Sequence, residues 1–441
     1  MRRAAFAAKS AVMMRSDRRA LRDMVHAERL PARELAELTD RRTTELVLHA
    51  YRTVPYYRDR FTAAGFSETD LRQAKNFVHL PVLTKADILD AGTDMVSCSA
   101  PVRDRLPSLT GGSTGAPLRV ENDARAPVAA LWWRIYGWWG VYPWDNAAFI
   151  YRQSRSGMAA VKYAAQWWPT RHALLDARGT TESDSAQFLR RIQRQRPALL
   201  VGYVEALADF ARFVERAGEQ LPSLRAVSVT ASMLQPGHRE LIERVFRAPL
   251  FDTYRSAEVP WMAAECSAHD GLHVLSDRRR IDLLDSGGHP VAIGETGNVA
   301  VTDLDNRVFP IVRYVIGDRT RALPDPCRCG RILPRISAIE GRIADALRTP
   351  SGRVVSGGLG GLFKASPGVV RHVQFHQRSD YSIVLRFVPG TDVALARAAA
   401  RRVADEVSGM LGHEVPVEIV EVDRIAGVGG KARFVVSDVS V

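Results

Sequence analysis

Strand-like and helix-like segments alternate along residues 146–254, and this alternation leaves few folds open to the chain. Apolar segments that are typical of strands occupy residues 146–152, 198–203, 224–230 and 248–254. Between them, residues 185–197, 204–218 and 235–246 carry apolar side chains at three- and four-residue spacing, which is typical of helices. Strands joined by helices of this length predict a parallel sheet with helical crossovers.

The flanking segments extend this prediction to the whole chain. Residues 271–323 hold several strand-like runs separated by turns, which predicts an antiparallel β portion, whereas the first 65 residues are mainly helical in pattern. After Asp345 come strands and one long helix, 392–412, in an α+β unit of about 95 residues. We therefore predict an α/β fold with a large mixed N-terminal domain, 1–345, and a small mobile C-terminal α+β domain, 346–441.

Composition narrows the class of protein. With 441 residues and 46% hydrophobic content, the chain can bury the cores of two or more domains. The net charge of +12 comes almost entirely from arginine, but the 49 acidic residues are interspersed and no basic motif with interleaved aromatic residues is present, so we expect no nucleic-acid partner. Because no apolar run is long enough to span a bilayer, we also expect no membrane insertion and a cytoplasmic location.

The segment "SLTGGSTGAPLRV", residues 108–120, combines glycines with hydroxyl side chains. Glycine lets backbone N–H groups converge on an anion, and Ser113 and Thr114 add hydroxyl donors. The segment is not a Walker A loop, because no lysine follows its last glycine. It is compatible with a phosphate-binding loop and with an ordinary surface turn, and other motifs in the chain are needed to distinguish the two.

Four further positions suit a nucleotide site, although each one alone also suits a turn or a surface charge. Tyr254 offers a flat ring for a base, and Glu258 a carboxylate for a metal ion. Asp318 is expected just after a strand, where its carboxylate could accept hydrogen bonds from ribose hydroxyls. Lys431, in "GVGGKARF", sits on a glycine-rich loop that could bring an ammonium group to a growing negative charge.

The four cysteines are too few for a disulfide scaffold in a chain of this length, and the spacing of three of them suits a metal. Cys266 precedes His269 by three residues, and Cys327 and Cys329 are separated by one residue. These four side chains form a set suited to structural Zn²⁺, with His273 as the alternative to His269. A site with four protein ligands leaves no open position, so we assign it to structure; reduced buried cysteines are the other interpretation.

The order of these motifs resembles that of the AMP-forming adenylating enzymes, and in particular the phenylacetate–CoA ligase family. The resemblance rests on "TGGSTGAP", "YRSAE", "RYVIGD", "GRIAD" and "GGKARFVVSDV", with "VPYYRDRF" and "LPVLTKADI" near the N-terminus. It covers nearly the whole chain. It implies an ATP-dependent ligase that forms an acyl adenylate and then transfers the acyl group to a thiol, most simply that of coenzyme A.

The resemblance also assigns roles to residues. It implies that the ATP phosphates are held by the loop residues Thr110, Gly111, Gly112, Ser113, Thr114 and Gly115. Tyr254 would pack on adenine, Asp318 would bind the ribose, Glu258 would hold Mg²⁺ and Arg342 would lie near the ribose and phosphate. Asp345 would be the hinge and Lys431 the catalytic lysine, with Thr114 and Glu258 also in the catalytic set. Apart from these family roles, we expect the carboxylic acid to enter a pocket built from residues 201–206 and 229–234, with Tyr203 and Ser232, and from part of the tryptophan-rich segment.

Two departures from the family pattern bear on function. Ala116 stands where the family loop often has a lysine, and Arg255 stands where glycine usually follows the tyrosine. They support, as an alternative, a non-catalytic nucleotide-binding relative, whereas the joint presence of Glu258, Asp318 and Lys431 favours an enzyme. An amine or a carrier protein stays open as the acceptor in place of coenzyme A, and so does assembly as a homodimer.

Overall fold

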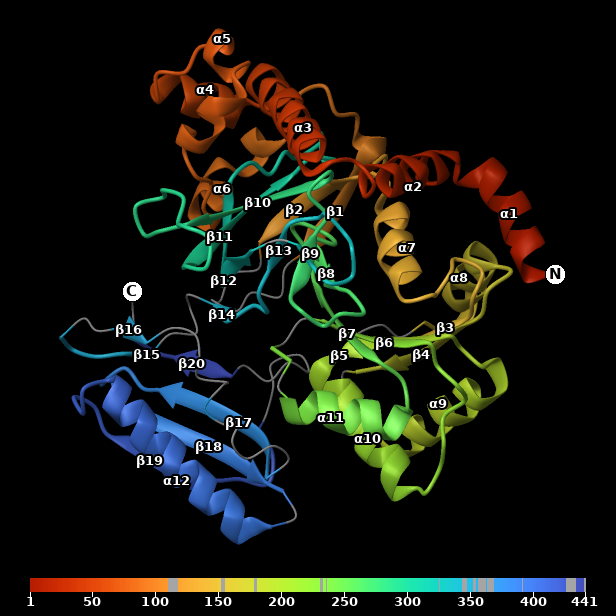
Figure 1. Cartoon of the computed structure of the whole chain (residues 1–441), viewed down its shortest axis with the longest axis vertical. Coiled ribbons are helices and arrows are strands. Elements are labelled where there is room, and N and C mark those ends of the chain that lie inside the picture. The colour runs from red at the N-terminus through yellow and green to blue at the C-terminus, as the bar shows by residue number, and fades with distance from the viewer. Residues whose placement is uncertain are drawn as a thin grey trace. The chain divides into compact units, whose positions relative to one another are not determined.

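The computed structural model describes residues 1–109, 118–151, 155–177, 181–230, 233–234, 236–324, 326–342, 347–351, 354–355, 362, 369–390, 392–425 and 434–439. The chain divides into two compact units. One unit comprises Met1–Phe6, Gly140–Asp252 and Glu340–Val441, and the other comprises Ala7–Trp139 and Thr253–Ile339. The division falls inside strand β7 (Leu250–Tyr254), so the chain passes from one unit to the other within an element. Figure 1 labels the elements of both units.

A five-stranded parallel sheet forms the centre of the first unit, in the order β4-β3-β5-β6-β7. Its other elements, in chain order, are β3 (Ala147–Tyr151), α8 (Gly157–Trp167), β4 (His172–Asp176), α9 (Glu182–Gln195), β5 (Leu199–Tyr203), α10 (Val204–Arg216), β6 (Ala226–Thr230) and α11 (Pro236–Phe246). Buried side chains of β3, β5 and β6 pack against α9, α10 and α11 in one apolar core. The predicted parallel sheet with helical crossovers is confirmed, although the sequence analysis did not anticipate α8 and β4.

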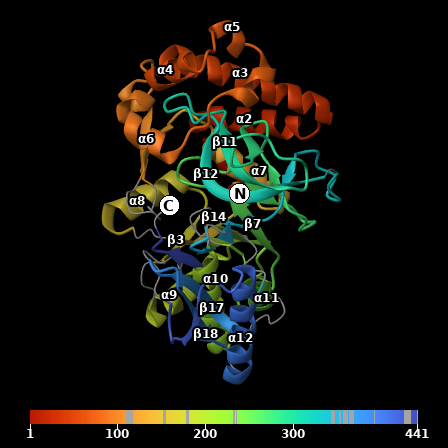
Figure 2. The same cartoon turned by 90° about the vertical axis from the view of Figure 1, so that its left-hand side faces the viewer.

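The C-terminal residues of the same unit form a second, smaller sheet in the order β19-β18-β17-β20, whose strands are labelled in Figure 1, and Figure 2 shows β17 and β18 from another side. The elements of this sheet and its helix are β17 (Val370–Gln377), β18 (Ile383–Pro389), α12 (Val393–Met410), β19 (Val417–Glu421) and β20 (Val435–Ser437). Before them in the chain, and outside this sheet, come β14 (Gly341–Arg342), β15 (Leu347–Arg348) and β16 (Val354–Val355). Small residues along α12, such as Ala396 and Ala400, let the helix pack closely on buried residues of β17 and β18. This is the predicted α+β unit; the domain boundary at Asp345 lies outside the described residues and stays a prediction.

The second unit combines helices with an antiparallel sheet in the order β10-β11-β12-β13-β9-β8. Its helices are α1 (Arg2–Met13, which begins in the first unit), α2 (Arg15–Ala27), α3 (Ala32–Thr53), α4 (Pro55–Ala63), α5 (Glu68–Leu71), α6 (Lys85–Ala91) and α7 (Val128–Trp138), with short 3₁₀ turns η1 (Ala74–His79), η2 (Gly92–Met95) and η3 (Val102–Asp104). Its strands are β1 (Arg105–Leu109), β2 (Arg119–Asp123), β8 (Ala263–Glu265), β9 (Leu272–Val274), β10 (Arg279–Leu284), β11 (Thr296–Asp303), β12 (Tyr314–Leu323) and β13 (Arg335–Ile336). No described helix combines the length and apolar character that a membrane span requires.

A buried arginine ties three segments of the second unit together. Arg134 of α7 donates from Nε to Glu28 at 2.5 Å and from Nη1 to Asp277 at 2.6 Å, and its side chain has no exposed surface. Glu28 follows α2, and Asp277 precedes β10. The two carboxylates hold the pKa of Arg134 above its usual value despite the cost of burial. The charge is therefore compensated only as long as all three segments stay together.

We expect Arg134→Met to destabilise the protein strongly, because it removes from Glu28 and Asp277 the guanidinium that donates to both in the interior. The loss should be about 3–5 kcal/mol in the free energy of unfolding. Urea unfolding followed by tryptophan fluorescence measures it. Arg33→Met is the matched control, since Arg33 forms a solvent-exposed pair with Glu37 and should unfold as the parent does. Equal stability of the two variants would contradict the proposed role of Arg134.

Candidate functional site

Tyr254 and Asp318, two of the residues predicted to hold the nucleotide, lie in contact. Tyr254 ends β7, and its hydroxyl donates to Oδ2 of Asp318 in β12 at 2.7 Å. Both side chains are mostly buried, with 8% and 6% exposed. The hydrogen bond fixes the rotamer of the carboxylate beside the phenol ring. The structure thus brings together an aromatic face and a carboxylate from segments 64 residues apart.

The position of Asp318 within its strand differs from the prediction. The sequence placed Asp318 just after a strand, but it lies inside β12, at a bulge: Val315 pairs with Ala300 and Arg319 pairs with Asn298, so the register shifts between them. Gly317 has φ +89°, a conformation that side chains rarely adopt. A bulge redirects the side chain that follows it. The glycine before Asp318 is the sequence signal that could have indicated this bulge.

The turn after β7 holds Glu258 and Arg255. Ser256 and Val259 close it with two hydrogen bonds, from the Ser256 N–H to the Val259 carbonyl at 3.1 Å and from the Val259 N–H to Ser256 Oγ at 3.0 Å. Glu258 lies half-buried between them. Ser108 Oγ, at the end of β1, donates to the Ala257 carbonyl at 3.2 Å. The turn that carries Glu258 is therefore anchored to the strand that leads into the glycine-rich segment.

Arg255 replaces the glycine of the family pattern without disturbing this turn. Its guanidinium lies over the ring of Trp261, 4.7 Å from the ring centroid. Such cation–π contacts stabilise a guanidinium that is partly removed from water. The bulk of Arg255 is thus accommodated on an aromatic face, and this departure from the pattern is compatible with an intact turn.

The glycine-rich segment connects the two strands of a hairpin, in which Leu109 of β1 pairs with Arg119 of β2. The predicted phosphate-binding residues themselves, Thr110, Gly111, Gly112, Ser113, Thr114 and Gly115, lie outside the described residues. So do Ser232, Asp345 and Lys431. Arg342 is in β14, but its side chain is not described. The roles predicted for these residues stay predictions.

Tyr203, predicted to line the acid pocket, is the last residue of β5 in the first unit. Its ring centroid lies 5.3 Å from that of Tyr151, the last residue of β3. The sequence analysis missed Tyr151. The signal was available, because "AAFIY" and "LLVGY" both end in tyrosine and adjacent parallel strands of equal length bring their last residues side by side. This carboxyl edge of a parallel sheet is where open α/β folds bind ligands.

Cys266, His273, Cys327 and Cys329 form a cluster in the second unit, with one potential ligand atom from each lying within 4.8 Å of the others. The Cys266 and Cys327 sulfurs are 3.7 Å apart, and His273 Nε2 is 3.2 Å from the Cys329 sulfur. Two thiolates bound tetrahedrally at about 2.3 Å from a shared Zn²⁺ would stand about 3.8 Å apart. The observed separation fits that value and is far too long for a disulfide.

The surroundings of the cluster also suit a metal. Nδ1 of His273 lies 3.0 Å from the Leu333 carbonyl, which orients the ring with Nε2 towards the thiols. Backbone N–H groups of Ala268, Cys329 and Arg331 donate to the three sulfurs at 3.4–3.5 Å. The histidine of this cluster is His273, whereas His269 Nδ1 faces Glu265 at 3.3 Å.

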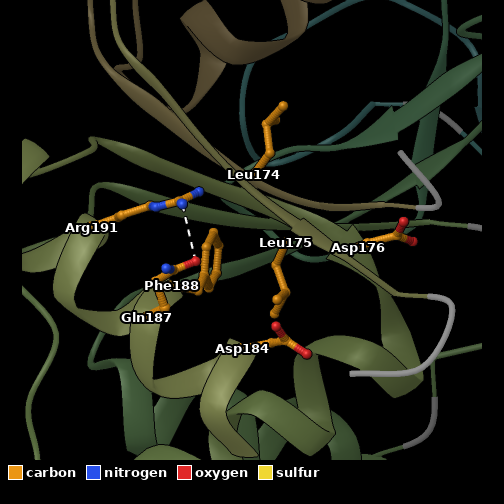
Figure 3. A pocket seen from close by; sticks show the side chains of 7 residues that line it. All are labelled: Leu174, Leu175, Asp176, Asp184, Gln187, Phe188 and Arg191. Carbon is orange, nitrogen blue, oxygen red and sulfur yellow. Dashed lines mark hydrogen bonds between the residues drawn. The ribbon is translucent and has the colours of Figure 1, made fainter. Parts of the chain in front are cut away.

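A cavity of about 520 Å³ lies elsewhere, beside the edge strand β4 and helix α9 (Figure 3). In the close-up, Gln187 and Arg191 of α9 are joined by a hydrogen bond of 3.0 Å on one side, and Asp176 and Asp184 stand on the other. The described lining is Leu174, Leu175, Asp176, Asp184, Gln187, Phe188 and Arg191. None of the predicted site residues is among them, so this cavity is not the site that the sequence motifs describe.

Known proteins similar to this chain agree with the motif order. No protein-family model matches the chain. A phenylacetate–coenzyme A ligase of Escherichia coli is 30% identical over 328 residues, which are 71% of this chain and 72% of the relative. A phenylacetate–coenzyme A ligase of Thermus thermophilus is 26% identical over 413 residues, or 90% of this chain and 88% of the relative.

Solved structures show the same fold. A 2-hydroxyisobutyryl-CoA ligase in its postadenylation state superposes with a TM-score of 0.76 at 22% identity, covering 93% of this chain and 91% of the other. An anthranilate–CoA ligase in complex with anthranoyl-AMP gives a TM-score of 0.55 at 13% identity, over 76% and 66% of the two chains. Because the Escherichia coli relative matches over more than two thirds of both chains, the family is shown, and the chain belongs to the phenylacetate–CoA ligase family.

Proposed function

We propose that the protein activates a carboxylic acid with ATP and transfers the acyl group to the thiol of coenzyme A. In the first step a carboxylate oxygen attacks the α-phosphorus of ATP, and the bond to pyrophosphate breaks. In the second step the thiolate attacks the carbonyl carbon of the acyl adenylate, and AMP leaves. The observation that carries the proposal is the contact of Tyr254 with Asp318, which joins two family motifs in one place.

The residues around this contact have distinct roles in the proposal. Tyr254 presents its ring to adenine, and Asp318 accepts hydrogen bonds from the ribose. Glu258 supplies a carboxylate to Mg²⁺, whose charge, once the ion is bound, offsets the charge that develops on the phosphates. Charged and hydrogen-bonding side chains that already stand in position before the reaction also stabilise this developing charge, because they need not move as it forms.

The remaining roles rest on the family motifs alone. Residues 110–115 would cradle the phosphates, with Thr114 among the catalytic set. Arg342 would lie near the ribose and phosphate, and Lys431 would stabilise the α-phosphate as the adenylate forms. Asp345 would be the hinge of the small domain. The acid would lie against Tyr203 and Ser232. Cytoplasmic location and a homodimer remain expectations of the sequence.

We also propose that Cys266, His273, Cys327 and Cys329 hold a structural Zn²⁺. Two observations support this proposal. The sulfurs of Cys266 and Cys327 are 3.7 Å apart, as expected of two ligands of a tetrahedral Zn²⁺, and the Leu333 carbonyl orients the His273 ring. The ion would join the turn after β8 to the segment before β13, and both strands flank β9 in the sheet. In this way it would stiffen the frame in which β7 presents Tyr254.

The function is tested by supplying ATP, Mg²⁺ and coenzyme A with a panel of aryl and alkyl carboxylic acids. Acyl-CoA is then measured by mass spectrometry. At least one acid should yield acyl-CoA together with equimolar AMP, and Lys431→Ala should not. If an amine acceptor is converted and coenzyme A is not, the acceptor assignment is wrong. If no acid releases pyrophosphate, the non-catalytic alternative holds.

Removing one oxygen from Tyr254 tests the nucleotide site. Tyr254→Phe keeps the ring but loses the hydrogen bond that orients Asp318, so KM for ATP should rise by roughly one to two orders of magnitude, the value of one hydrogen bond to a charged group. KM for the acid should not change, since the proposal assigns Asp318 to the ribose of ATP and not to the acid. Initial-rate kinetics with each substrate varied separately measure both. An unchanged KM for ATP in both Tyr254→Phe and Asp318→Ala would contradict the assignment.

Metal analysis of the purified full chain tests the zinc proposal. The protein should contain about one Zn²⁺ per chain. Cys329→Ser and His273→Ala should lose the ion and lower the unfolding temperature by several degrees, because breaking the site frees two chain segments. His269→Ala is the matched control and should keep both metal and stability. Zinc-free protein, or loss of zinc in the His269 variant alone, would contradict the proposed ligand set.

A further inference from the structure

A mostly buried carboxylate in the first unit faces two imidazoles that are also mostly buried. Glu205 lies in the first turn of α10, and its Oε2 is buried without a hydrogen-bond partner among the described residues. Two imidazoles face this oxygen. His238 Nε2, from α11, lies 3.6 Å away, and His372 Nδ1, from β17, lies 3.7 Å away. Both distances are just beyond hydrogen-bond range.

The cluster joins segments that are far apart in the sequence. Glu205 and His238 belong to α10 and α11, the helices beside the parallel sheet, whereas His372 belongs to β17, an inner strand of the small C-terminal sheet. The two imidazole rings are 6.2 Å apart, nearly edge to face. The exposed fractions are small for a polar group: 7% for His238, 19% for Glu205 and 20% for His372. In ordinary surface ion pairs a much larger fraction of each side chain is exposed to solvent.

The remaining charged groups around the cluster are few. Asp209 of α10 lies 4.0 Å from His372 Nε2, but its carboxylate already pairs with Arg212 at 2.8 Å. Arg212 disfavours protonation of both imidazoles, and the backbone of Arg371 faces His238. The described side chains that face the two imidazoles are therefore Glu205, Asp209 and Arg212, and the separation of β17 from α10 and α11 would expose the two rings and Glu205 to water.

We propose that Glu205, His238 and His372 are positioning residues that hold segment 340–441 against the α10–α11 layer, and that protonation of the imidazoles releases this contact. The two histidines and the carboxylate act together. Neutral imidazole rings are stable in the buried contact, whereas charged rings are more stable in water and so favour its opening. The positioning matters for the reaction because this segment carries Lys431. The effect on the reaction therefore rests on the proposed function, whereas the contact between β17 and the two helices does not.

The direction of the pH effect follows from the protonation of each state. Burial lowers the pKa of His238 to about 4 and also lowers that of His372, so both rings bind protons more readily when released, near the ordinary value of about 6.5. Burial raises the pKa of Glu205, which acts in the opposite sense. Release therefore lets two imidazoles take up protons, whereas only one carboxyl group loses its tendency to do so. Acidification from pH 7 to pH 5.5 therefore favours release.

Hydrogen exchange followed by mass spectrometry on the full chain tests the contact without requiring activity. At pH 7, His372→Asn and Glu205→Gln should each speed exchange in the first turn of α10 and the start of β17 by about fivefold, and the double variant should add little to either. His376→Asn is the matched control, since His376 pairs with Asp438 inside the C-terminal sheet, at 2.7 Å, and should change nothing at α10.

A second readout separates positioning from general destabilisation. The ratio of the rates of adenylate formation and thioester formation should change at least threefold in His372→Asn but not in His376→Asn. The pH dependence of this ratio between 5.5 and 7 should flatten in His372→Asn. Additive effects on exchange, or equal effects of the two histidine variants, would overturn the inference. A parent protein that forms no adenylate would refute the proposed function, and the exchange result would still decide the contact.

Discussion

The hydrogen bond between Tyr254 and Asp318 is the constraint on which the candidate site depends. Along the sheet, the path from β7 to β12 runs through β8, β9 and β13, which is four strand pairings. In a flat sheet, four pairings of about 4.8 Å would separate the two strands by roughly 19 Å. A contact of 2.7 Å between their side chains therefore requires a strongly curved sheet. The short β8, β9 and β13 and the bulge in β12 provide that curvature.

The Cys/His cluster lies among the short strands of this path. His273 belongs to β9, Cys266 directly follows β8, and the two remaining cysteines precede β13. The shortest strands of the sheet have only a few backbone hydrogen bonds each, so cross-linking by a metal would add order where the ladder supplies little. The metal proposal and the nucleotide proposal are thus linked through the same strands.

The sequence predicted what depends on local pattern and missed what depends on register. Alternating apolar segments were sufficient for the parallel sheet and the C-terminal α+β unit, because periodicity is local. The strand β4 escaped the analysis because the helix before it, α8, has no buried residue and its apolar side chains, such as Met158 and Val161, are mostly exposed, so the pattern of a buried helical crossover is missing. The choice of His273 over His269 depends on how strands align, and spacing along the chain does not encode that alignment. For the pairing of Tyr151 with Tyr203 and for the bulge before Asp318 the sequence holds a signal, the tyrosine that ends both strands and Gly317, but the strand register decides what these residues meet.

The central claim is that the carboxylate of the acid attacks ATP at the α-phosphorus to form an acyl adenylate. Isotope transfer tests this claim directly. An accepted acid labelled with ¹⁸O in both carboxylate oxygens is converted in unlabelled water with ATP, Mg²⁺ and coenzyme A, and the products are analysed by mass spectrometry. The account predicts one ¹⁸O atom in AMP, one in the acyl-CoA carbonyl and none in pyrophosphate. Label in inorganic phosphate together with ADP, or unlabelled AMP, would contradict it.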